Sequence, residues 1–254
     1  MRALEQLYAL GALNDRGALT KLGRRMAELP LDPMLAKCLV AAGDAGCGEE
    51  VVTIAAMLGV GGSVFYRPKD RALHADAAHA AFSIGNAGDH ITLLNVYNGW
   101  AAAGYSPAWC AESYVQPRSM GRARDVRDQL VGLMTRIEAP LLSAAGDCDL
   151  VRKTLAAGFF YHTAKLGRGG GYRTLKAPPQ AVALHPSSAY AAPGTPAPRW
   201  VIYHELVLTS GEFMRTVSEI KPGWLVEVAP HYYSAGEVAV EEVKKGGGGG
   251  GGKG

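Results

Sequence analysis

Cysteine is scarce in this chain, and its four copies stand far apart. They form no CxxC pair and no Cys/His spacing of the kind that holds zinc. Neither a disulfide framework nor a structural zinc site is indicated, and a reducing compartment fits this cysteine usage best. The four residues are Cys38, Cys47, Cys110 and Cys148.

Long apolar runs and strong net charge are also missing. No stretch of about 18 apolar residues occurs, and the first five residues lack the apolar segment of a secretory signal, so we expect a soluble chain. With 254 residues, 48% of them hydrophobic, the chain can form one large or two or three small domains. A net charge of +3 is too small to indicate nucleic-acid binding, and any such inference must come from local clusters.

Motifs for catalysis are absent as well. The sequence has no GxSxG or HExxH pattern, and the glycine clusters at 59–62 and 167–171 do not continue into Gly-Lys-Ser/Thr. His74 and His79 lie five positions apart on an expected helix, so they face different sides and are expected to be surface residues. In the segment 185–188, a turn that caps itself is favoured over acyl-transfer chemistry, because no acidic partner is placed by the sequence. The pattern predicts a binding function.

The N-terminal 140 residues show mainly helical patterns. Residues 2–10 form an amphipathic pattern, and residues 11–19 resemble two short strands around an Asn-Asp-Arg-Gly turn, which together indicate a fragment of a winged helix. Thr20 is expected to cap the next helix, and Asp32 with Pro33 to begin another. From about residue 33 to 140 the pattern predicts a helical bundle with Asp89 as an N-cap, and its expected helices span 33–42, 49–58, 68–82, 89–102, 106–114 and the segment that follows.

That last segment is basic. On a helix, one apolar stripe is formed by Val126, Leu130, Leu133, Met134 and Ile137. Arg118, Arg122, Gln129 and Arg136 share another face, and Arg124 and Arg127 flank the stripe, so guanidinium groups could reach phosphate oxygens while the helix packs. The alternative is a solvated helix face with its own partners Asp125 and Asp128.

The composition changes after a helix expected at 150–157 behind Asp147 as its cap. β-branched and aromatic residues then dominate the segments 172–175, 181–185, 200–208 and 212–220, which are separated by proline- and glycine-containing turns. We expect these strands to close into a small β-barrel, followed by a short helix near Lys221-Pro222. The glycines 246–252 are expected to form a flexible tail outside the fold.

Several motifs occur in the order found in one family. They include Leu-Thr-Lys-Leu-Gly-Arg-Arg-Met-Ala-Glu-Leu-Pro-Leu-Asp-Pro at 19–33, Val-Phe-Tyr-Arg-Pro-Lys at 64–69, Gly-Asp-His-Ile-Thr-Leu-Leu at 88–94, His-Pro-Ser-Ser at 185–188 and Trp-Val-Ile-Tyr-His-Glu-Leu-Val-Leu at 200–208. Over residues 2–233 the chain resembles the C-terminal part of DEAH-box RNA helicases, particularly the spliceosomal group. The resemblance implies an α+β multidomain fold: a partial winged helix at 1–32, a helical ratchet domain of the HA2 type at 33–145, an OB-like β-barrel with a terminal helix at 146–233, and a glycine-rich tail at 234–254.

The resemblance also implies partners and a mechanism. In this family ATP and Mg²⁺ are bound by two RecA-like motor domains, which we expect in cis and which these 254 residues do not contain; no cofactor is expected in this part. Ratchet and barrel would form the wall of a channel through which single-stranded RNA moves. Other implied features are a G-patch-type cofactor protein, spliceosome components and a nuclear location, with no membrane.

The implied RNA contacts fall into two groups. On the ratchet helix they are Arg118, Arg122, Arg124 and Arg127, and on the barrel they are Tyr172, Arg173, His185, Ser187 and Ser188. Ordinary strand packing is the alternative for Tyr172 and Arg173. Pro117 and Gly121 depart from the better helix formers usual in the family, which leaves the start of the basic helix open. A stand-alone module that docks a partner without catalysis is the alternative function.

Overall fold

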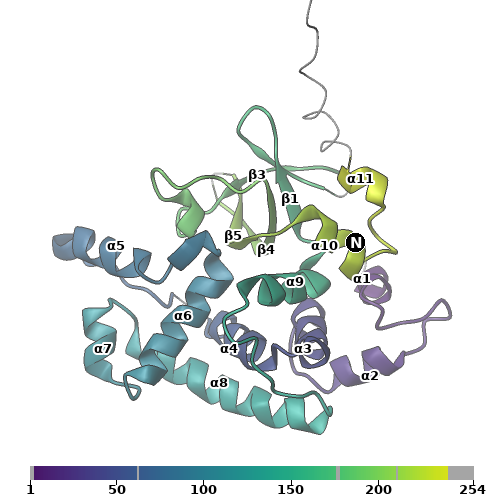
Figure 1. The fold of residues 1–254 in the computed structure, drawn as a ribbon, viewed down its shortest axis with the longest axis horizontal. Helices are drawn as coiled ribbons and strands as arrows, with labels where there is room; N and C mark the ends of the chain where they lie inside the picture. The colour runs from purple at the N-terminus through teal and green to yellow at the C-terminus, as the bar shows by residue number, and fades with distance from the viewer. Residues whose placement is uncertain (1–2, 62, 176–177, 210, 240–254) are drawn as a thin grey trace, which may run out of the picture.

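The computed structural model describes residues 3–61, 63–175, 178–209 and 211–239. A layer of helices lies beneath a small β-barrel, and the N-terminal helices lie at one end of that layer (Figure 1). The expected glycine-rich segment 246–252 lies outside the described residues.

The N-terminal part is held by local hydrogen bonds. Helix α1 (Ala3–Ala9) is followed by a turn in which the Asn14 side chain accepts the amides of Arg16 and Ala18. The two short strands expected here are reduced to one bridge between Leu13 and Leu19, flanked by hydrogen bonds from the Asn14 amide to the Ala18 carbonyl and from the Thr20 amide to the Ala12 carbonyl. Thr20 caps α2 (Lys21–Ala27), and its hydroxyl accepts the Gly23 amide at 3.0 Å, as predicted.

The central part is a helical bundle, as predicted for residues 33–140. Its helices are α3 (Pro33–Ala45), α4 (Gly48–Leu58), α5 (Ala72–Ala80), α6 (Asp89–Ala102), α7 (Pro107–Glu112), α8 (Pro117–Arg136) and α9 (Cys148–Phe159), with 3-10 turns η1 (Lys69–Arg71) and η2 (Ile84–Asn86). Helix α9 was expected outside the bundle but packs on α3 and belongs to it. The predicted caps Asp32 and Asp147 each accept an amide of the first helical turn at 2.9 Å. Side-chain caps of this kind satisfy amides that have no partner within the helix.

Helices α3 and α9 are the most closely packed pair. Gly158 makes this possible, because a Cβ atom there would lie 2.2 Å from the Met34 carbonyl oxygen and 2.4 Å from the Cys38 sulfur. The neighbouring side chains Leu39 and Phe159 are almost fully buried in the same core.

The predicted strands close into a barrel with the order β1-β2-β3-β5-β4. They are β1 (Thr163–Leu166), β2 (Tyr172–Thr174), β3 (Ala181–Leu184), β4 (Trp200–Leu208) and β5 (Glu212–Glu219), and η3 (Ala189–Ala191) lies between β3 and β4. Strand β1 was not expected from the sequence, since it has four residues and directly follows a helix. The glycine cluster at 167–171 joins β1 to β2 as a hairpin turn.

The chain then forms α10 (Pro222–Val228), as expected after Lys221, and α11 (Ala235–Ala239). Helix α10 packs on α9, which connects the barrel to the bundle. All four cysteines are free thiols. Among the described residues, no helix combines the length and apolarity needed to cross a bilayer.

Candidate nucleic-acid interface

Helix α8 is a single uninterrupted helix of 20 residues. Pro117 occupies its first turn, where a missing amide hydrogen costs nothing, and the helix continues through Gly121. Of the predicted stripe, Leu130, Met134 and Ile137 are buried. The apolar contact also extends toward the N-terminus through Met120 and Ala123, which lie outside the predicted stripe. The helix therefore begins where the basic segment begins, and Arg118 belongs to it.

Arg118 and Arg122 lie on the exposed side of α8. Their spacing of four residues places them one above the other on the same face. Among the described residues neither of them forms an ion pair, although the alternative interpretation gave this face partners of its own. The N-terminal half of α8 thus presents two adjacent guanidinium groups to solvent.

Arg124 is held above aromatic rings. Its guanidinium carbon lies 5.9 Å from the centre of the Trp100 ring and 5.5 Å from that of Tyr105, and these two rings pack edge to face. Asp125 approaches the Arg124 side chain only to 3.9 Å, and the side chain is 45% exposed. The aromatic contact fixes the cation while leaving part of it accessible to an anion.

Arg127 points into the bundle. It forms an ion pair with Glu49, its Nε donates to the Thr53 hydroxyl at 2.8 Å, and its guanidinium lies over the Tyr97 ring. The expectation that this shoulder of the helix is free for phosphate is wrong, because the partner comes from α4, whose position the spacing on α8 cannot reveal. Arg127 connects α8 to α4 and α6.

Tyr172 belongs to the barrel core. It is 5% exposed, and its hydroxyl donates to the Pro198 carbonyl at 2.6 Å. Burial raises the pKa of Tyr172 to about 12. Arg173, the next residue on β2, is exposed and stands opposite Lys165 of β1. Strand packing therefore accounts for the tyrosine, and only the arginine is placed to meet a ligand.

The loop after β3 caps itself, as the sequence predicted. The His185 Nδ1 and the Ser187 hydroxyl are 2.7 Å apart, and the Ser188 amide donates to the His185 carbonyl at 2.9 Å. Ser187 is exposed, and His185 is partly so. Ser188 is only 5% exposed, so its hydroxyl serves the fold.

Asp89 was expected to cap α6, and this expectation is wrong. Gly88 occupies the cap position, and the Asp89 carboxylate turns away from its own helix to accept the amides of Ala189 and Val217, each at 2.8 Å. The Ser188 hydroxyl also bonds to this carboxylate. No local pattern could have shown this contact, because the partners lie 100 and 128 positions further along the chain.

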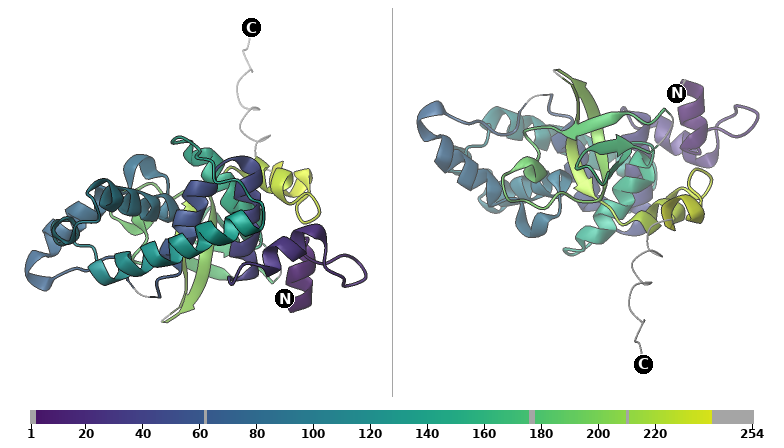
Figure 2. Two further views of the ribbon diagram at one scale, coloured as in Figure 1. Left: turned by 90° about the horizontal axis from the view of Figure 1, so that it is seen from below. Right: turned by 90° about the horizontal axis from the view of Figure 1, so that it is seen from above.

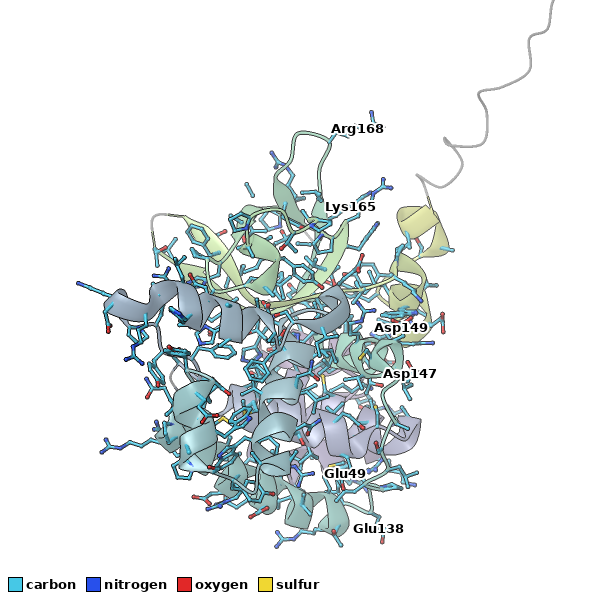
Figure 3. The ribbon with its side chains drawn as sticks, turned by 60° about the vertical axis from the view of Figure 1, so that its left-hand side comes forward. Glu49, Glu138, Asp147, Asp149, Lys165 and Arg168 are labelled. Carbon is cyan, nitrogen blue, oxygen red and sulfur yellow. The ribbon has the colours of Figure 1, made fainter. Side chains whose placement is uncertain are left out.

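The two groups of predicted contacts lie on opposite sides of the helical layer. Seen from below, α8 runs along the face turned to the viewer, whereas the barrel strands face the viewer from above (Figure 2). Figure 3 likewise places Glu49, the partner of Arg127, far from Lys165 and Arg168 on the barrel. Helix α6 connects the two sides, with Asp89 touching the barrel at its first turn and Trp100 lying under Arg124 near its last.

Three family models match the chain. Residues 3–31 match the winged-helix part of the helicase associated domain (HA2), and residues 32–93 match its ratchet-like part. Residues 151–232 match the oligonucleotide/oligosaccharide-binding (OB)-fold. Helix α8 lies between the last two matched regions.

Proposed function

Because the chain carries the helicase-associated winged-helix, ratchet-like and OB-fold domains, which form the C-terminal region of DEAH/RHA-type helicases, we propose that it is the RNA-binding accessory part of an ATP-dependent DEAH-box RNA helicase. ATP and Mg²⁺ would be bound by RecA-like domains in cis. This chain would supply one wall of the channel that guides single-stranded RNA.

The observation that carries the proposal is the exposed cationic face of α8. Arg118 and Arg122 are adjacent and have no ion-pair partner among the described residues, and Arg124 is fixed beside them by two aromatic rings. Charge on a rigid helix favours contact with phosphates, and it does not distinguish bases. An enzyme that moves along RNA of any sequence needs this kind of contact.

The barrel offers contacts of a second type. Arg173 can pair with a phosphate, and the His185 and Ser187 side chains present polar atoms at the surface of the adjoining loop. OB-like barrels bind single strands through such grooves and loops. Tyr172 and Ser188 are excluded from direct contact by their burial.

A binding titration tests the proposal. A fluorescently labelled single-stranded RNA is titrated with the 254-residue chain at several salt concentrations, and the logarithm of the binding constant is plotted against the logarithm of the salt concentration. Replacing Arg118 and Arg122 together by alanine should reduce the slope by about 1.4, since each phosphate contact on a single strand contributes about 0.7. A double alanine variant of Arg16 and Arg71, which are exposed elsewhere, serves as the charge-matched control.

The finer assignment to pre-mRNA splicing, whether in spliceosome remodelling or in mRNA release, rests on the order of the motifs. It implies a nuclear location and contact with spliceosome components. If it is correct, small nuclear RNAs should co-purify with the tagged chain from nuclear extract, and the Arg118/Arg122 variant should recover less of them. Recovery of other RNA classes alone would contradict the splicing role and leave RNA binding intact.

A second candidate function is favoured by the winged-helix surface. Leu4, Tyr8 and Leu19 are 70%, 52% and 48% exposed, and a hollow of about 280 Å³ is lined by residues of the same segment. Exposed apolar groups of this kind suit a docking protein, such as a G-patch-type cofactor. Failure of the chain to bind RNA even at low salt would favour this docking function over the RNA wall.

A further inference from the structure

The Asp89 carboxylate gathers three donors that belong to the barrel. One oxygen accepts the Ala189 amide and the other accepts the Val217 amide, each at 2.8 Å. The Ser188 hydroxyl is the third donor. A carboxylate has no hydrogens to offer, so both of its oxygens can accept at once, which an amide side chain cannot reproduce. Asp89 thus binds the loop after β3 and strand β5 with one side chain.

The residues on either side of Asp89, Gly88 and His90, also contact strand β5 of the barrel. At Gly88, whose φ is +97°, a Cβ atom would lie 2.6 Å from the Ser218 hydroxyl oxygen, so only glycine permits this approach. His90 is fully buried, and its Nδ1 lies 2.8 Å from the same hydroxyl. Three consecutive residues of the ratchet therefore contact the barrel.

Strand β5 is distorted where Asp89 binds it. Thr216 has a φ of +54°, which is an unusual conformation for a β-branched residue. The regular pairs of β5 with β4 continue on both sides, at Arg215 with Glu205 and at Val217 with Tyr203. Backbone strain of this kind persists only where surrounding contacts impose it. The Val217 amide is one of those contacts.

From these observations we propose that Asp89 is a positioning residue that fixes the loop 185–188 relative to the ratchet and so orients the barrel's polar groups toward the RNA backbone. The proposal rests on the proposed RNA-binding function and adds the residue that connects the two surfaces. Ser187 and His185 touch the ligand in this scheme. Asp89 lies behind them and acts only through the loop.

The first test compares Asp89→Asn with Asp76→Asn. Asp76 is an exposed ratchet carboxylate that pairs with Arg67, so its variant has the same change of charge without touching the barrel. Asp89→Asn should weaken binding of the labelled single-stranded RNA about tenfold. The slope against salt should stay unchanged, because hydroxyl and imidazole contacts release no counterions. Asp76→Asn should bind as the unaltered chain does.

A second measurement separates positioning from general loss of structure. Amide hydrogen exchange at Ala189 and Val217 should become faster in Asp89→Asn, while exchange at Leu155 in the α9 core stays slow. Ser188→Ala should have a smaller effect of the same kind, because it removes only the buried hydroxyl that donates to the Asp89 carboxylate. This variant should weaken RNA binding about threefold. In a background that already carries His185→Ala and Ser187→Ala, Asp89→Asn should have no further effect on RNA binding.

The outcomes are distinguishable. If the unaltered chain does not bind RNA at low salt, the proposed function is overturned and this inference with it. If binding weakens in the Arg118/Arg122 variant but not in Asp89→Asn, the positioning role alone is overturned. The same conclusion follows if Asp89→Asn weakens binding equally with and without the loop side chains.

Discussion

Replacing Gly121 by alanine should stabilise the protein, whereas replacing Gly158 by alanine should destabilise it. Gly158 and Gly121 both lie inside helices, α9 and α8, and both have ordinary helical backbone angles. Alanine is favoured over glycine in a helix by about 1 kcal/mol, because glycine loses more conformational freedom on folding. Only the surroundings of the added methyl group differ.

At Gly158 the methyl group has no room. It would lie 2.2 Å from the Met34 carbonyl oxygen, 2.4 Å from the Cys38 sulfur and 3.2 Å from the Cys38 amide nitrogen. Two of these atoms belong to the α3 backbone, so the helices must separate. Overpacking of this kind costs about 3 kcal/mol at the upper end of its usual range, which leaves a net loss of about 2 kcal/mol after the gain in helix propensity.

At Gly121 the methyl group meets no atom within 4 Å, so the gain of about 1 kcal/mol remains. Urea denaturation followed by circular dichroism should place the Gly121→Ala midpoint above that of the unaltered chain and the Gly158→Ala midpoint below it. In thermal unfolding the shifts should be about 2–4 °C upward and 4–8 °C downward. A neutral or stabilising Gly158→Ala variant would refute the close packing of α3 against α9, and a destabilising Gly121→Ala variant would refute the open environment on α8.

Two further predictions concern the contacts that hold the site in place. Arg127→Ala should lower the free energy of unfolding by about 1–2 kcal/mol. A double-mutant cycle with Glu49→Gln should give a coupling free energy of about 1 kcal/mol, because the ion pair is partly screened by solvent. Additive effects of the two substitutions would contradict the ion pair. Burial lowers the pKa of His90 from its ordinary value of about 6.5 to about 3. Between these two pH values the unfolded chain therefore takes up a proton at His90 while the folded chain does not. The stability contributed by the neutral His90 side chain is full above about pH 6.5 and is lost as the pH falls toward 3. Unfolding free energy should therefore be about 2 kcal/mol lower at pH 5 than at pH 8, and by clearly less in His90→Asn; an equal pH dependence in the two proteins would contradict burial of His90 as the cause.

Much of the local structure could be predicted from neighbouring residues. The caps Thr20, Asp32 and Asp147 each act within their own helix, so the information that places them lies within a few positions of the sequence. The strands β4 and β5 were also recognisable from their β-branched residues. Strand β1 was not predicted, because its four residues are too few to show an alternating pattern.

The side-chain partners of the site depend on distant parts of the chain, and prediction failed there. Arg127 has two acidic residues nearby on its own helix, but it binds Glu49, which is 78 positions away. Asp89 has the residue type and position of a helix cap, but its carboxylate is taken by backbone amides of the barrel. Asp89 was predicted to have a local role and Arg127 to be free for phosphate, and in both cases a tertiary contact takes the side chain instead.

Asp89, which contacts the barrel, and Trp100, which lies under Arg124, both belong to α6, so this helix sets the spacing of the proposed RNA surfaces. Trp100 follows Asp89 by 11 residues on this helix, so the barrel contact and the aromatic support of Arg124 are about 17 Å apart at about 1.5 Å per residue. A short RNA can reach the α8 arginines or the barrel loop, whereas only a longer strand can reach both. The loss of affinity in Asp89→Asn should therefore appear for long RNAs and vanish for RNAs that bind α8 alone, while the loss in the Arg118/Arg122 variant should appear for both. If Asp89→Asn weakens binding equally at every RNA length, α6 does not separate the two surfaces in the way that this spacing requires.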